Sequence, residues 1–288
     1  MKAIACTRYG SLDALELVEM PEPAPGDDEA LVKVYAASVT YAKLMLATGK
    51  PFVGRLMGSG LRRPKQHMFG ADTAGRIESV GRNVQQFRPG DEVFGDLSDC
   101  GKGGFSEYVC APTDALAMKP TNISFEEAAV VPEAALVALQ ALRDRGRIQA
   151  GQKVLIVGAS GGIGTFAVQI AKHFRAEVTA VCGARNVDLV TSLGADHVID
   201  YTKEDFSQNG ERYDLIVATA GYRWILDYKG ALSPLGIYVS TGGTMTQVFQ
   251  ALLLGPLLSV AGSKKLGGML VKTNKDLGVI KELIEGHL

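Results

Sequence analysis

The sequence lacks the patterns that mark secreted, membrane-spanning and metal-binding chains. Its cysteines are few and scattered, without a C-x-x-C pair, so reduced thiols are expected rather than a disulfide framework. The four are Cys6, Cys100, Cys110 and Cys182. The longest apolar stretch, residues 249–261, contains a glycine and a proline and is too short to cross a bilayer. The first residues, MKAIACTRYG, form no apolar signal segment, which predicts a cytoplasmic protein.

An excess of either charge is also missing. The formal net charge is -1, so nothing favours nucleic acid or an anionic membrane as a partner. The histidines show no spacing suited to metal ligands, and no metal ion is predicted. They are His67, His173, His197 and His287. The chain of 288 residues is 47% hydrophobic and 21% charged, which is typical of a globular protein and long enough for two domains.

The most informative stretch runs from Gly151 to Phe174, GQKVLIVGASGGIGTFAVQIAKHF. The apolar run VLIV is followed by glycines and then by apolar residues at helical spacing, which predicts a buried parallel strand, a tight turn and a helix. Residues 159–164 match the A-x-G-x-x-G form of the dinucleotide fingerprint. Gly161 would let the backbone approach a pyrophosphate, Gly164 would let the helix pack close to its strand, and the helix N-terminus would attract the phosphates.

Two other interpretations of this stretch stay open. Residues 158–162 also spell G-x-S-x-G, the nucleophile elbow of α/β-hydrolases, with Ser160 as the nucleophile. A serine hydrolase then needs an acid, Asp200 or Asp214, followed by a histidine, and after these acids there is His287. Because chain ends fray and several strands should precede such an elbow, this is a remote alternative. The third interpretation is a glycine-rich turn that binds no ligand.

The next predicted strand favours the dinucleotide interpretation. It ends in VCGARN, residues 181–186, where an NAD-selective site would place an acid on the ribose 2′-hydroxyl. No acid stands there. Gly183 leaves room for a 2′-phosphate and Arg185 can bind it through charge-assisted hydrogen bonds, so NADPH is the predicted cofactor. In the alternative, Arg185 is simply an exposed residue at the start of a helix.

Hydrophobic patterning divides the chain into two parts. Short strands and frequent turns predict a mostly β first lobe with an irregular loop at residues 46–66. Ser124, followed by acidic residues, predicts a helix that continues to Leu142. Strands and helices then alternate, which predicts an α/β doubly wound parallel sheet, so the predicted domains are 1–122 and 123–288. The expected strands are 30–35, 75–80, 92–94, 153–157, 177–182, 197–199, 213–218, 237–240 and 268–271, and the later helices are 163–174, 186–193, 223–232, 246–260 and 275–285.

Several further motifs carry a resemblance to a known family. They are GASGGIG at 158–164, GADTAG at 70–75 with ESVG at 78–81, GDEVFG at 90–95, GFSEY at 104–108 and LGAD at 193–196. Together with the order of a β-rich lobe, a linking helix and a nucleotide-binding part, they resemble the medium-chain dehydrogenase/reductase (MDR) superfamily. The segment VTAVCGARN is most similar to its zinc-free quinone oxidoreductase (zeta-crystallin-like) and alkenal reductase branch. The resemblance implies a GroES-like lobe followed by a Rossmann domain.

The resemblance also implies a zinc-independent, NADPH-dependent reductase. Zinc enzymes of the superfamily carry a Cys at the position of Thr40, an Asp at that of Lys43 and a His at that of Ala71, so the catalytic zinc ligands are missing. Without a metal, hydride transfer to a quinone or to an α,β-unsaturated carbonyl is expected, because such a substrate spreads the arriving charge over its own conjugated oxygen. Both substrate classes fit.

The candidate catalytic residues lie in residues 38–43, SVTYAK, where the resembled family has S-V-N-P-x-D with the Asn near the nicotinamide. Thr40 would keep one hydroxyl hydrogen bond, and Tyr41 or Lys43 would donate to the substrate oxygen. In the alternative, these three residues only begin a surface helix.

The resemblance further implies the other cofactor contacts and a homodimer. The pyrophosphate would lie on the glycine turn, the adenosine near Tyr201, and the ribose and nicotinamide at the ends of two later strands. The candidate cofactor-binding residues are Ser160, Gly161, Gly162, Ile163, Gly164, Cys182, Gly183, Arg185, Asn186, Tyr201, Thr219, Ala220, Gly221, Thr241, Gly242 and Gly243.

The end of the sequence departs from the family pattern. Family members return after the last Rossmann helix through a strand, a helix and a final strand that complete the first lobe, whereas this sequence stops at Leu288. The first lobe is then expected to expose apolar surface, to be poorly ordered or to be covered by a partner. A shortened paralogue that binds NADPH without reducing a substrate is therefore the alternative function.

Overall fold

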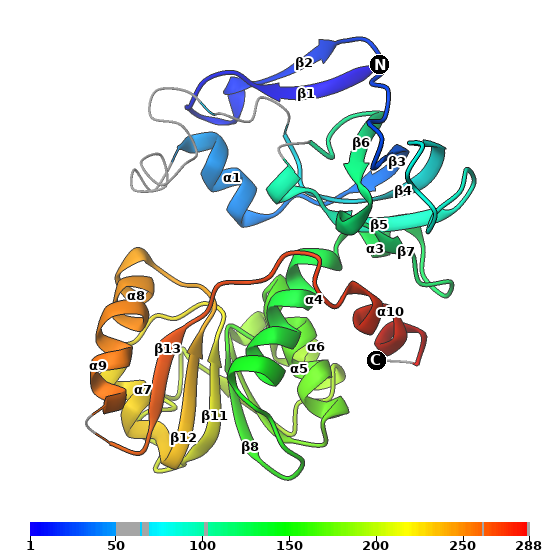
Figure 1. Ribbon diagram of the computed structural model, residues 1–288. Helices are drawn as coiled ribbons and strands as arrows, with labels where there is room; N and C mark the ends of the chain where they lie inside the picture. Colours follow the sequence, from blue (N-terminus) through cyan, green and yellow to red (C-terminus); the bar gives the residue numbers. More distant parts are fainter. Residues whose placement is uncertain (50–63, 65–68, 101–102, 261, 287–288) are drawn as a thin grey trace. The chain divides into compact units, whose positions relative to one another are not determined.

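The computed structural model describes residues 1–49, 64, 69–100, 103–260 and 262–286. They form two compact units, of which the first takes residues 1–136 and 272–287 and the second takes residues 137–271 (Figure 1). None of the helices in these described ranges has both the length and the apolar character that a membrane crossing requires.

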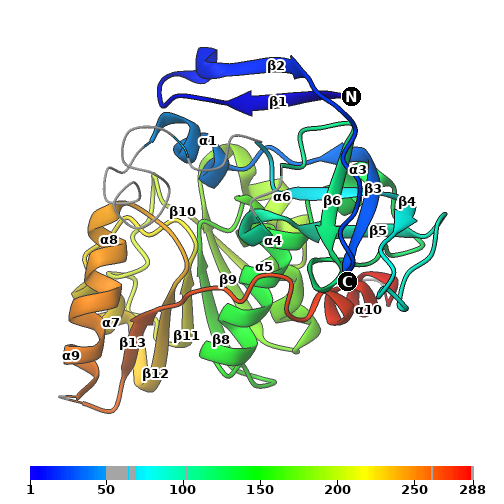
Figure 2. The ribbon, with the colours of Figure 1, turned by 45° about the horizontal axis from the view of Figure 1, so that its top comes forward.

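The second unit is built on a six-stranded parallel sheet with the order β10-β9-β8-β11-β12-β13 (Figures 1 and 2). Its strands are β8 (Lys153–Val157), β9 (Glu177–Cys182), β10 (His197–Asp200), β11 (Tyr213–Ala218), β12 (Leu232–Ser240) and β13 (Lys265–Gly268). Its helices are α5 (Gly162–His173), α6 (Val187–Ser192), α7 (Ile225–Ala231), α8 (Met245–Phe249) and α9 (Gly255–Val260). The predicted doubly wound parallel sheet is confirmed.

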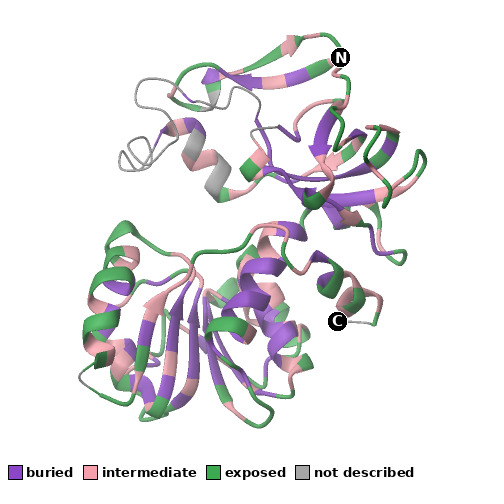
Figure 3. Cartoon of the chain, in the orientation of Figure 1, coloured by how far each residue is buried: buried purple, intermediate pink, exposed green. Residues whose placement is uncertain are grey.

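The strand order explains where a ligand can bind in this unit. From β8 the chain moves outward through β9 to β10 and then crosses back to β11, on the other side of β8. Ligands of open parallel sheets bind at the carboxyl ends of the strands where the winding reverses, which here lies between β8 and β11. The VLIV run of β8 is at most 1% exposed, so the centre of the sheet is buried on both faces (Figure 3).

The first unit contains an antiparallel five-stranded sheet with the order β6-β3-β4-β5-β7 and a two-stranded pair, β1 and β2. Its strands are β1 (Lys2–Cys6), β2 (Leu15–Glu19), β3 (Glu29–Ala37), β4 (Asp72–Val80), β5 (Glu92–Asp96), β6 (Tyr108–Pro112) and β7 (Ala117–Met118), and its helices are α1 (Tyr41–Thr48), α3 (Phe125–Ala129), the first part of α4 (Pro132–Leu139) and α10 (Leu277–Glu285). Small and branched apolar side chains from these strands form a buried core, which includes Val32, Ile77, Val93 and Val109.

The C-terminal segment belongs to this first unit. The Asn274 amide pairs with the backbone of Asp96: the Asp96 N–H donates to Oδ1 over 2.9 Å, and Nδ2 donates to the Asp96 carbonyl over 2.7 Å. Farther along, Glu285 Oε1 accepts from the backbone N–H and the hydroxyl of Thr121, at 2.9 and 3.1 Å. Polar contacts therefore hold both ends of residues 274–285 to the β-rich unit.

The predicted helix from Ser124 to Leu142 is divided in the structure. The predicted cap at Ser124 is confirmed, because its hydroxyl accepts from the Glu127 N–H over 3.2 Å while the Glu127 carboxylate accepts from the Ser124 N–H over 2.8 Å. The helix α3 ends at Ala129, and α4 starts at Pro132, where a proline is tolerated because the first helical N–H needs no intrahelical acceptor. A π-helical turn then covers residues 140–145.

The strand predictions differ from the structure at β13 and in the first unit, where β6 and β7 were not predicted. The strand expected at residues 268–271 lies at Lys265–Gly268. It was misplaced because its last two residues are glycines, which have a low β propensity. Its last carbonyl, that of Gly268, accepts from Arg145 Nη2 over 3.0 Å. The β1–β2 pair was not predicted as separate strands. Most of the loop predicted at 46–66 lies outside the described residues.

Candidate functional site

The turn that follows β8 is shaped by two glycines. Gly158 has a φ of +84°, and a Cβ there would lie 2.7 Å from the Cβ of Ala220 and 2.8 Å from Thr219 Oγ1. A Cβ on Gly164 would lie 2.1 Å from the carbonyl oxygen of Gly158. Only glycine therefore lets α5 start so close to the end of β8.

The first turn of α5 offers backbone donors. Gly161 is its N-terminal flanking residue and makes no side-chain cap, and the N–H groups of the first helical turn, from Gly162 onward, have no acceptor within the helix. Gly161 and Gly162 are exposed, and a Cβ on Gly161 would meet only the Gly158 carbonyl, at 3.4 Å. An anion can reach these N–H groups and is stabilised by the helix dipole.

The end of β9 lies beside this turn. The N–H groups of Gly158 and Ala159 donate to the Val181 carbonyl at 3.1 and 3.0 Å, and Asn186 Nδ2 donates to Ser160 Oγ over 3.1 Å. Burial, and then the nearby Asp200 carboxylate, raises the pKa of the Cys182 thiol, so this buried side chain is uncharged.

The adenosine-side candidates gather around Gly183. A Cβ on Gly183 would lie 3.3 Å from the Tyr201 hydroxyl, so the tyrosine passes close over the strand end. The backbone N–H of Tyr201 donates to the Cys182 carbonyl over 3.1 Å. Tyr201 is 53% exposed, and Arg185 is also exposed, in a 3₁₀ turn before α6. The exposed guanidinium of Arg185 and the exposed ring of Tyr201 therefore lie beside Gly183, which has no side chain.

The ends of β11 and β12 complete this edge of the sheet. Thr219 Oγ1 donates to the carbonyls of Val157 and Gly158, each over 3.1 Å, which joins β11 to the glycine turn. A backbone bridge pairs Gly221 with Gly243, whose φ is +125°. The predicted residues Thr219, Ala220, Gly221, Thr241, Gly242 and Gly243 thus lie along the same carboxyl edge as the glycine turn.

Tyr222 was missed by the sequence analysis. It is partly exposed, and its ring lies 5.9 Å from that of Tyr201, with the Arg223 guanidinium 5.4 Å from its centroid. Burial is the main cause that raises the pKa of its phenol. No sequence motif includes Tyr222, and the one feature that could have indicated it is its position directly after Gly221, just beyond the end of β11.

The candidate catalytic residues lie in the first unit, between β3 and α1. The Thr40 carbonyl accepts the Leu44 N–H over 3.1 Å, so Thr40 precedes the first turn of α1, and Tyr41 opens the helix with 75% of its surface exposed. Lys43 lies in α1, and its side chain is outside the described residues. The helix start predicted as the alternative interpretation is therefore present, and it leaves the Tyr41 hydroxyl accessible.

The hydrolase alternative finds little support in the structure. Asp214 lies at the start of β11 and accepts from the Lys153 N–H over 3.0 Å, which places it at the amino edge of the sheet, opposite Ser160. Asp200 ends β10, two strands away from β8, and His287 lies outside the described residues. The nucleophile elbow holds its serine in a strained turn. In this turn the positive φ belongs to Gly158.

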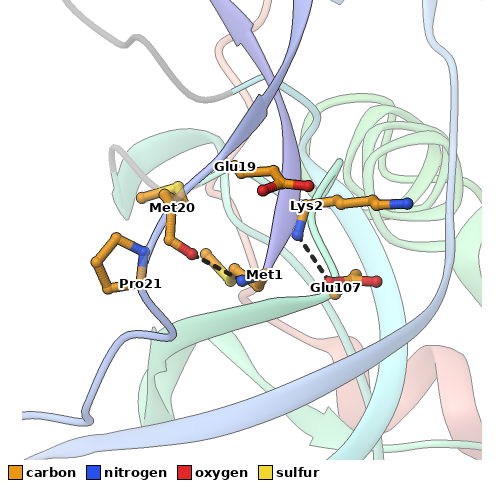
Figure 4. Close-up of a pocket in the computed structure, with 6 residues that line it drawn as sticks. All are labelled: Met1, Lys2, Glu19, Met20, Pro21 and Glu107. Carbon is orange, nitrogen blue, oxygen red and sulfur yellow. Dashed lines mark hydrogen bonds between the residues drawn. The ribbon is translucent and has the colours of Figure 1, made fainter.

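A separate pocket of about 500 Å³ lies between β1, β2 and Glu107 in the first unit (Figure 4). The Lys2 N–H donates to Glu107 Oε2 over 2.7 Å, and the N-terminal ammonium donates to the Met20 carbonyl over 2.7 Å. None of the predicted site residues lines it. Across the described part of the chain, no three His, Cys, Asp or Glu side chains are grouped to hold a metal ion.

Comparison with known proteins gives the same assignment from both halves of the chain. The family model of the alcohol dehydrogenase GroES-like domain matches residues 26–121, and that of the zinc-binding dehydrogenases matches residues 162–277. The chloroplast envelope quinone oxidoreductase homolog of Arabidopsis thaliana is 37% identical over 232 residues, which cover 76% of this chain and 68% of that protein. The NADPH-dependent alkenal/one oxidoreductase of Arabidopsis thaliana is 33% identical over 230 residues, which cover 77% of this chain and 58% of that protein.

A solved structure agrees with this assignment. The quinone oxidoreductase from Coxiella burnetii superposes with a TM-score of 0.86 at 29% identity, covering 99% of this chain and 88% of that one. The predicted resemblance is confirmed. The chain belongs to the medium-chain dehydrogenase/reductase superfamily and is an oxidoreductase grouped with its quinone and alkenal oxidoreductases.

Proposed function

We propose that this chain is an NADPH-dependent reductase that transfers a hydride to quinones or α,β-unsaturated carbonyl compounds without a metal ion. The observation that carries the proposal is the carboxyl edge of the parallel sheet, where an open helix N-terminus lies beside a strand end that carries Arg185 and no acid. The names of the relatives support the two substrate classes, and one of them includes NADPH.

The residues at this edge fit a dinucleotide. The exposed N–H groups of the first turn of α5 would hold the pyrophosphate, since they lack acceptors within the helix. A 2′-phosphate would lie beside Gly183 and next to the Tyr201 hydroxyl, which is 3.3 Å from the position that a Cβ would take there, and Arg185 is exposed two residues further along the chain. Thr241, Gly242 and Gly243 would line the nicotinamide side. Each of these assignments follows from position at the strand ends.

Bound NADPH supplies the hydride. The chain's own residues then have two tasks, which are to hold the acceptor in place and to provide a hydrogen-bond donor for the oxygen on which negative charge develops. In this proposal the Tyr41 hydroxyl is that donor, and Thr40 and Lys43 assist from the same turn. The positions at which zinc enzymes of the superfamily carry Cys and His are occupied by Thr40 and Ala71, which cannot ligate zinc in that way.

Arg185→Ala tests the cofactor choice. Losing a charge-assisted bond to the 2′-phosphate should cost roughly 1.5 to 3 kcal/mol, or about ten- to hundred-fold in NADPH affinity, and leave NADH binding almost unchanged. Arg212→Ala is the matched control, because Arg212 is an exposed arginine just before the amino end of β11. An unaltered ratio of NADPH to NADH affinity in Arg185→Ala refutes the NADPH assignment.

The reaction is tested by NADPH consumption with a quinone, an enone, an aldehyde and no acceptor. Rapid consumption with the quinone or the enone, and slow consumption with the aldehyde, supports the proposal. Binding of NADPH without consumption by any acceptor selects the alternative, a binding protein without reductase activity. Labelling of Ser160 by a fluorophosphonate would select the hydrolase instead.

We further propose that the protein is a homodimer through the β13 edge of the sheet. Among the described strands, β13 pairs with β12 alone. The Leu266 N–H and C=O are bonded to the Ser259 hydroxyl and the Gly268 carbonyl accepts from Arg145, so a second copy would pack on this edge through side chains and would not extend the sheet. Helix α9 and the π-helical turn before it, residues 250–254, lie next to β13, and they carry exposed apolar side chains, including Leu253 and Leu257. Sedimentation of the protein should give twice the chain mass. The cytoplasmic location stays a prediction, since relatives are named as chloroplast and mitochondrial proteins.

A further inference from the structure

A buried carboxyl connects the candidate catalytic turn to the rest of the first unit. Asp72 opens β4 and is 1% exposed. Its Oδ2 accepts from the Ser38 hydroxyl over 3.3 Å, and both of its oxygens accept from the Glu133 N–H over 3.3 Å. The Ser38 N–H also donates to the Asp72 carbonyl over 3.1 Å. One residue therefore joins the end of β3 to the start of α4.

The surroundings of Asp72 disfavour a negative charge. The two groups that donate to it do so at the long end of the hydrogen-bond range, so they compensate only weakly for the loss of water. Among the residues that the structure describes, the charged groups that act on it are both acidic: Asp96, which is its direct partner in the β4–β5 register, and Glu133 at the start of α4. Like charges opposite each other across two strands repel.

Asp96 is hydrogen-bonded better than its neighbour. Its Oδ1 accepts from the Ser98 N–H over 2.8 Å and from the Ser98 hydroxyl. When two carboxyls belong to residues that face each other across paired strands, the one with the poorer donors keeps a proton more readily. Burial first, then the Asp96 and Glu133 charges, raise the pKa of Asp72 well above its ordinary value, and the donors from Glu133 and Ser38 lower it by less.

The pair of Asp72 and Ser38 fixes one end of the turn that carries Thr40 and Tyr41. The other end is fixed by α1, through the bond from the Leu44 N–H to the Thr40 carbonyl. Ser38 is almost fully buried, whereas Tyr41 is exposed, so the anchor is inside the unit and the candidate donor is at its surface.

We propose that Asp72, in its protonated form, is a positioning residue that holds Ser38 and thereby sets the Thr40–Tyr41 turn for reduction. This inference rests on the proposed function of that turn. Ionisation places a charge among Asp96, Glu133 and the apolar core. Repulsion then drives the Asp72 carboxylate away from Asp96, and the Ser38 hydroxyl moves with it, because a hydrogen bond to a charged acceptor is the stronger one. Turnover should therefore fall as the pH rises through the pKa of Asp72.

Stability should change with pH in the same direction. The folded-state pKa of Asp72 is raised above the value of the unfolded chain, so the folded protein binds more protons between these two values. Its free energy of unfolding then decreases as the pH rises from the unfolded pKa through the folded one. Asp72→Asn, which keeps the shape and cannot ionise, should remove this loss.

The test compares the wild type with Asp72→Asn, using Asp114→Asn, an exposed carboxyl of the same unit, as the matched control. Infrared spectra of the protein without substrate should show the C=O band of a protonated carboxyl that weakens as the pH rises. The band should be present in the wild type and in Asp114→Asn and absent in Asp72→Asn. In the wild type kcat should fall about tenfold per pH unit above the pKa of Asp72, and Asp72→Asn should lose this limb of the profile.

Ser38→Ala gives a second variant in case Asp72→Asn fails to fold. It should shift the frequency of the carboxyl band, because the hydroxyl partner is gone, and lower kcat while NADPH binding is unchanged. A missing band, or a pH limb that Asp72→Asn retains, overturns the role of Asp72. No turnover by the wild type with any acceptor instead overturns the proposed function, so the two failures are distinguishable.

Discussion

Gly164→Ala is the substitution that tests most directly how the dinucleotide turn is built. Gly164 lies in the first turn of α5, and a Cβ there would lie 2.1 Å from the Gly158 carbonyl oxygen and 2.7 Å from backbone atoms of Ala159. These atoms belong to the backbone and cannot rotate away as a flexible side chain can. The helix must therefore shift away from β8 to accept even one methyl group.

Two opposing terms set the size of the effect. Alanine is the better helix former by about 1 kcal/mol, which favours the variant. Overpacking of a close contact costs about 1 to 3 kcal/mol, and the clash with backbone atoms of two consecutive residues places this site at or above the upper end. The expected net loss is about 2 kcal/mol of unfolding free energy, equivalent to a fall in Tm of roughly 4 to 8 °C.

The chain carries its own probe for this measurement. Its one tryptophan, Trp224, stands just before α7 in the second unit, so tryptophan fluorescence follows the unfolding of that unit. Gly230→Ala is the matched control, because Gly230 lies in α7 and a Cβ added there would meet no atom within 4 Å, so the change should raise stability by up to about 1 kcal/mol. If Gly164→Ala stabilises the unit as Gly230→Ala does, the close-packing argument for the turn is wrong.

Two further changes address the first unit. Hydrogen bonds from Lys281, and then from Thr121, lower the pKa of Glu285 to about 2, against an ordinary value of 4.5. The contribution of Glu285 to stability is therefore present above about pH 4.5 and is lost as the pH falls through 2. Glu285→Gln should remove this acid-sensitive part, which an acid titration of amide exchange in α10 would detect, and identical titrations would count against the contact. Tyr41→Phe should lower quinone turnover roughly 100-fold with NADPH affinity unchanged, and equal turnover would end the donor role.

The strand, turn and helix of residues 151–174 were predictable from sequence because their signals are local. A buried strand, a glycine turn and a helix follow one another within residues 151–174, and each part has its own residue pattern. The doubly wound parallel sheet followed from the alternation of strands and helices, whereas the order of its strands was not predicted. Errors appeared where the pattern was weak, as at β13, whose Gly267 and Gly268 lie close to neighbouring side chains and carry no β-branched side chain of their own.

The return of residues 272–287 to the first unit was beyond the sequence analysis for a different reason. It depends on contacts such as that of Asn274 with Asp96, which are 178 residues apart in the chain. The Asn274 side-chain amide binds the backbone of β5 as a neighbouring strand would, and a single asparagine gives no periodic pattern in the sequence. Asp72 was also visible in the sequence, within the GADTAG motif, but its role was not. A carboxyl becomes unusual only through its neighbours, and Asp96 and Glu133 reach it through the fold.

The two halves of the proposed site therefore differ in what they depend on. In the second unit the proposed cofactor site would use backbone N–H groups, and it includes positions where a side chain would clash, so most substitutions there should act through stability and binding together. In the first unit the turn depends on a few side chains, with Asp72 and Ser38 inside and Tyr41 outside. Because ionisation of Asp72 beside Asp96 lowers the stability of the fold, Asp72→Asn should make this unit more stable than the wild type above the pKa of Asp72, while removing this response to pH. Gly164→Ala should instead lose stability and NADPH affinity in parallel, and the contrast separates packing from positioning in one protein.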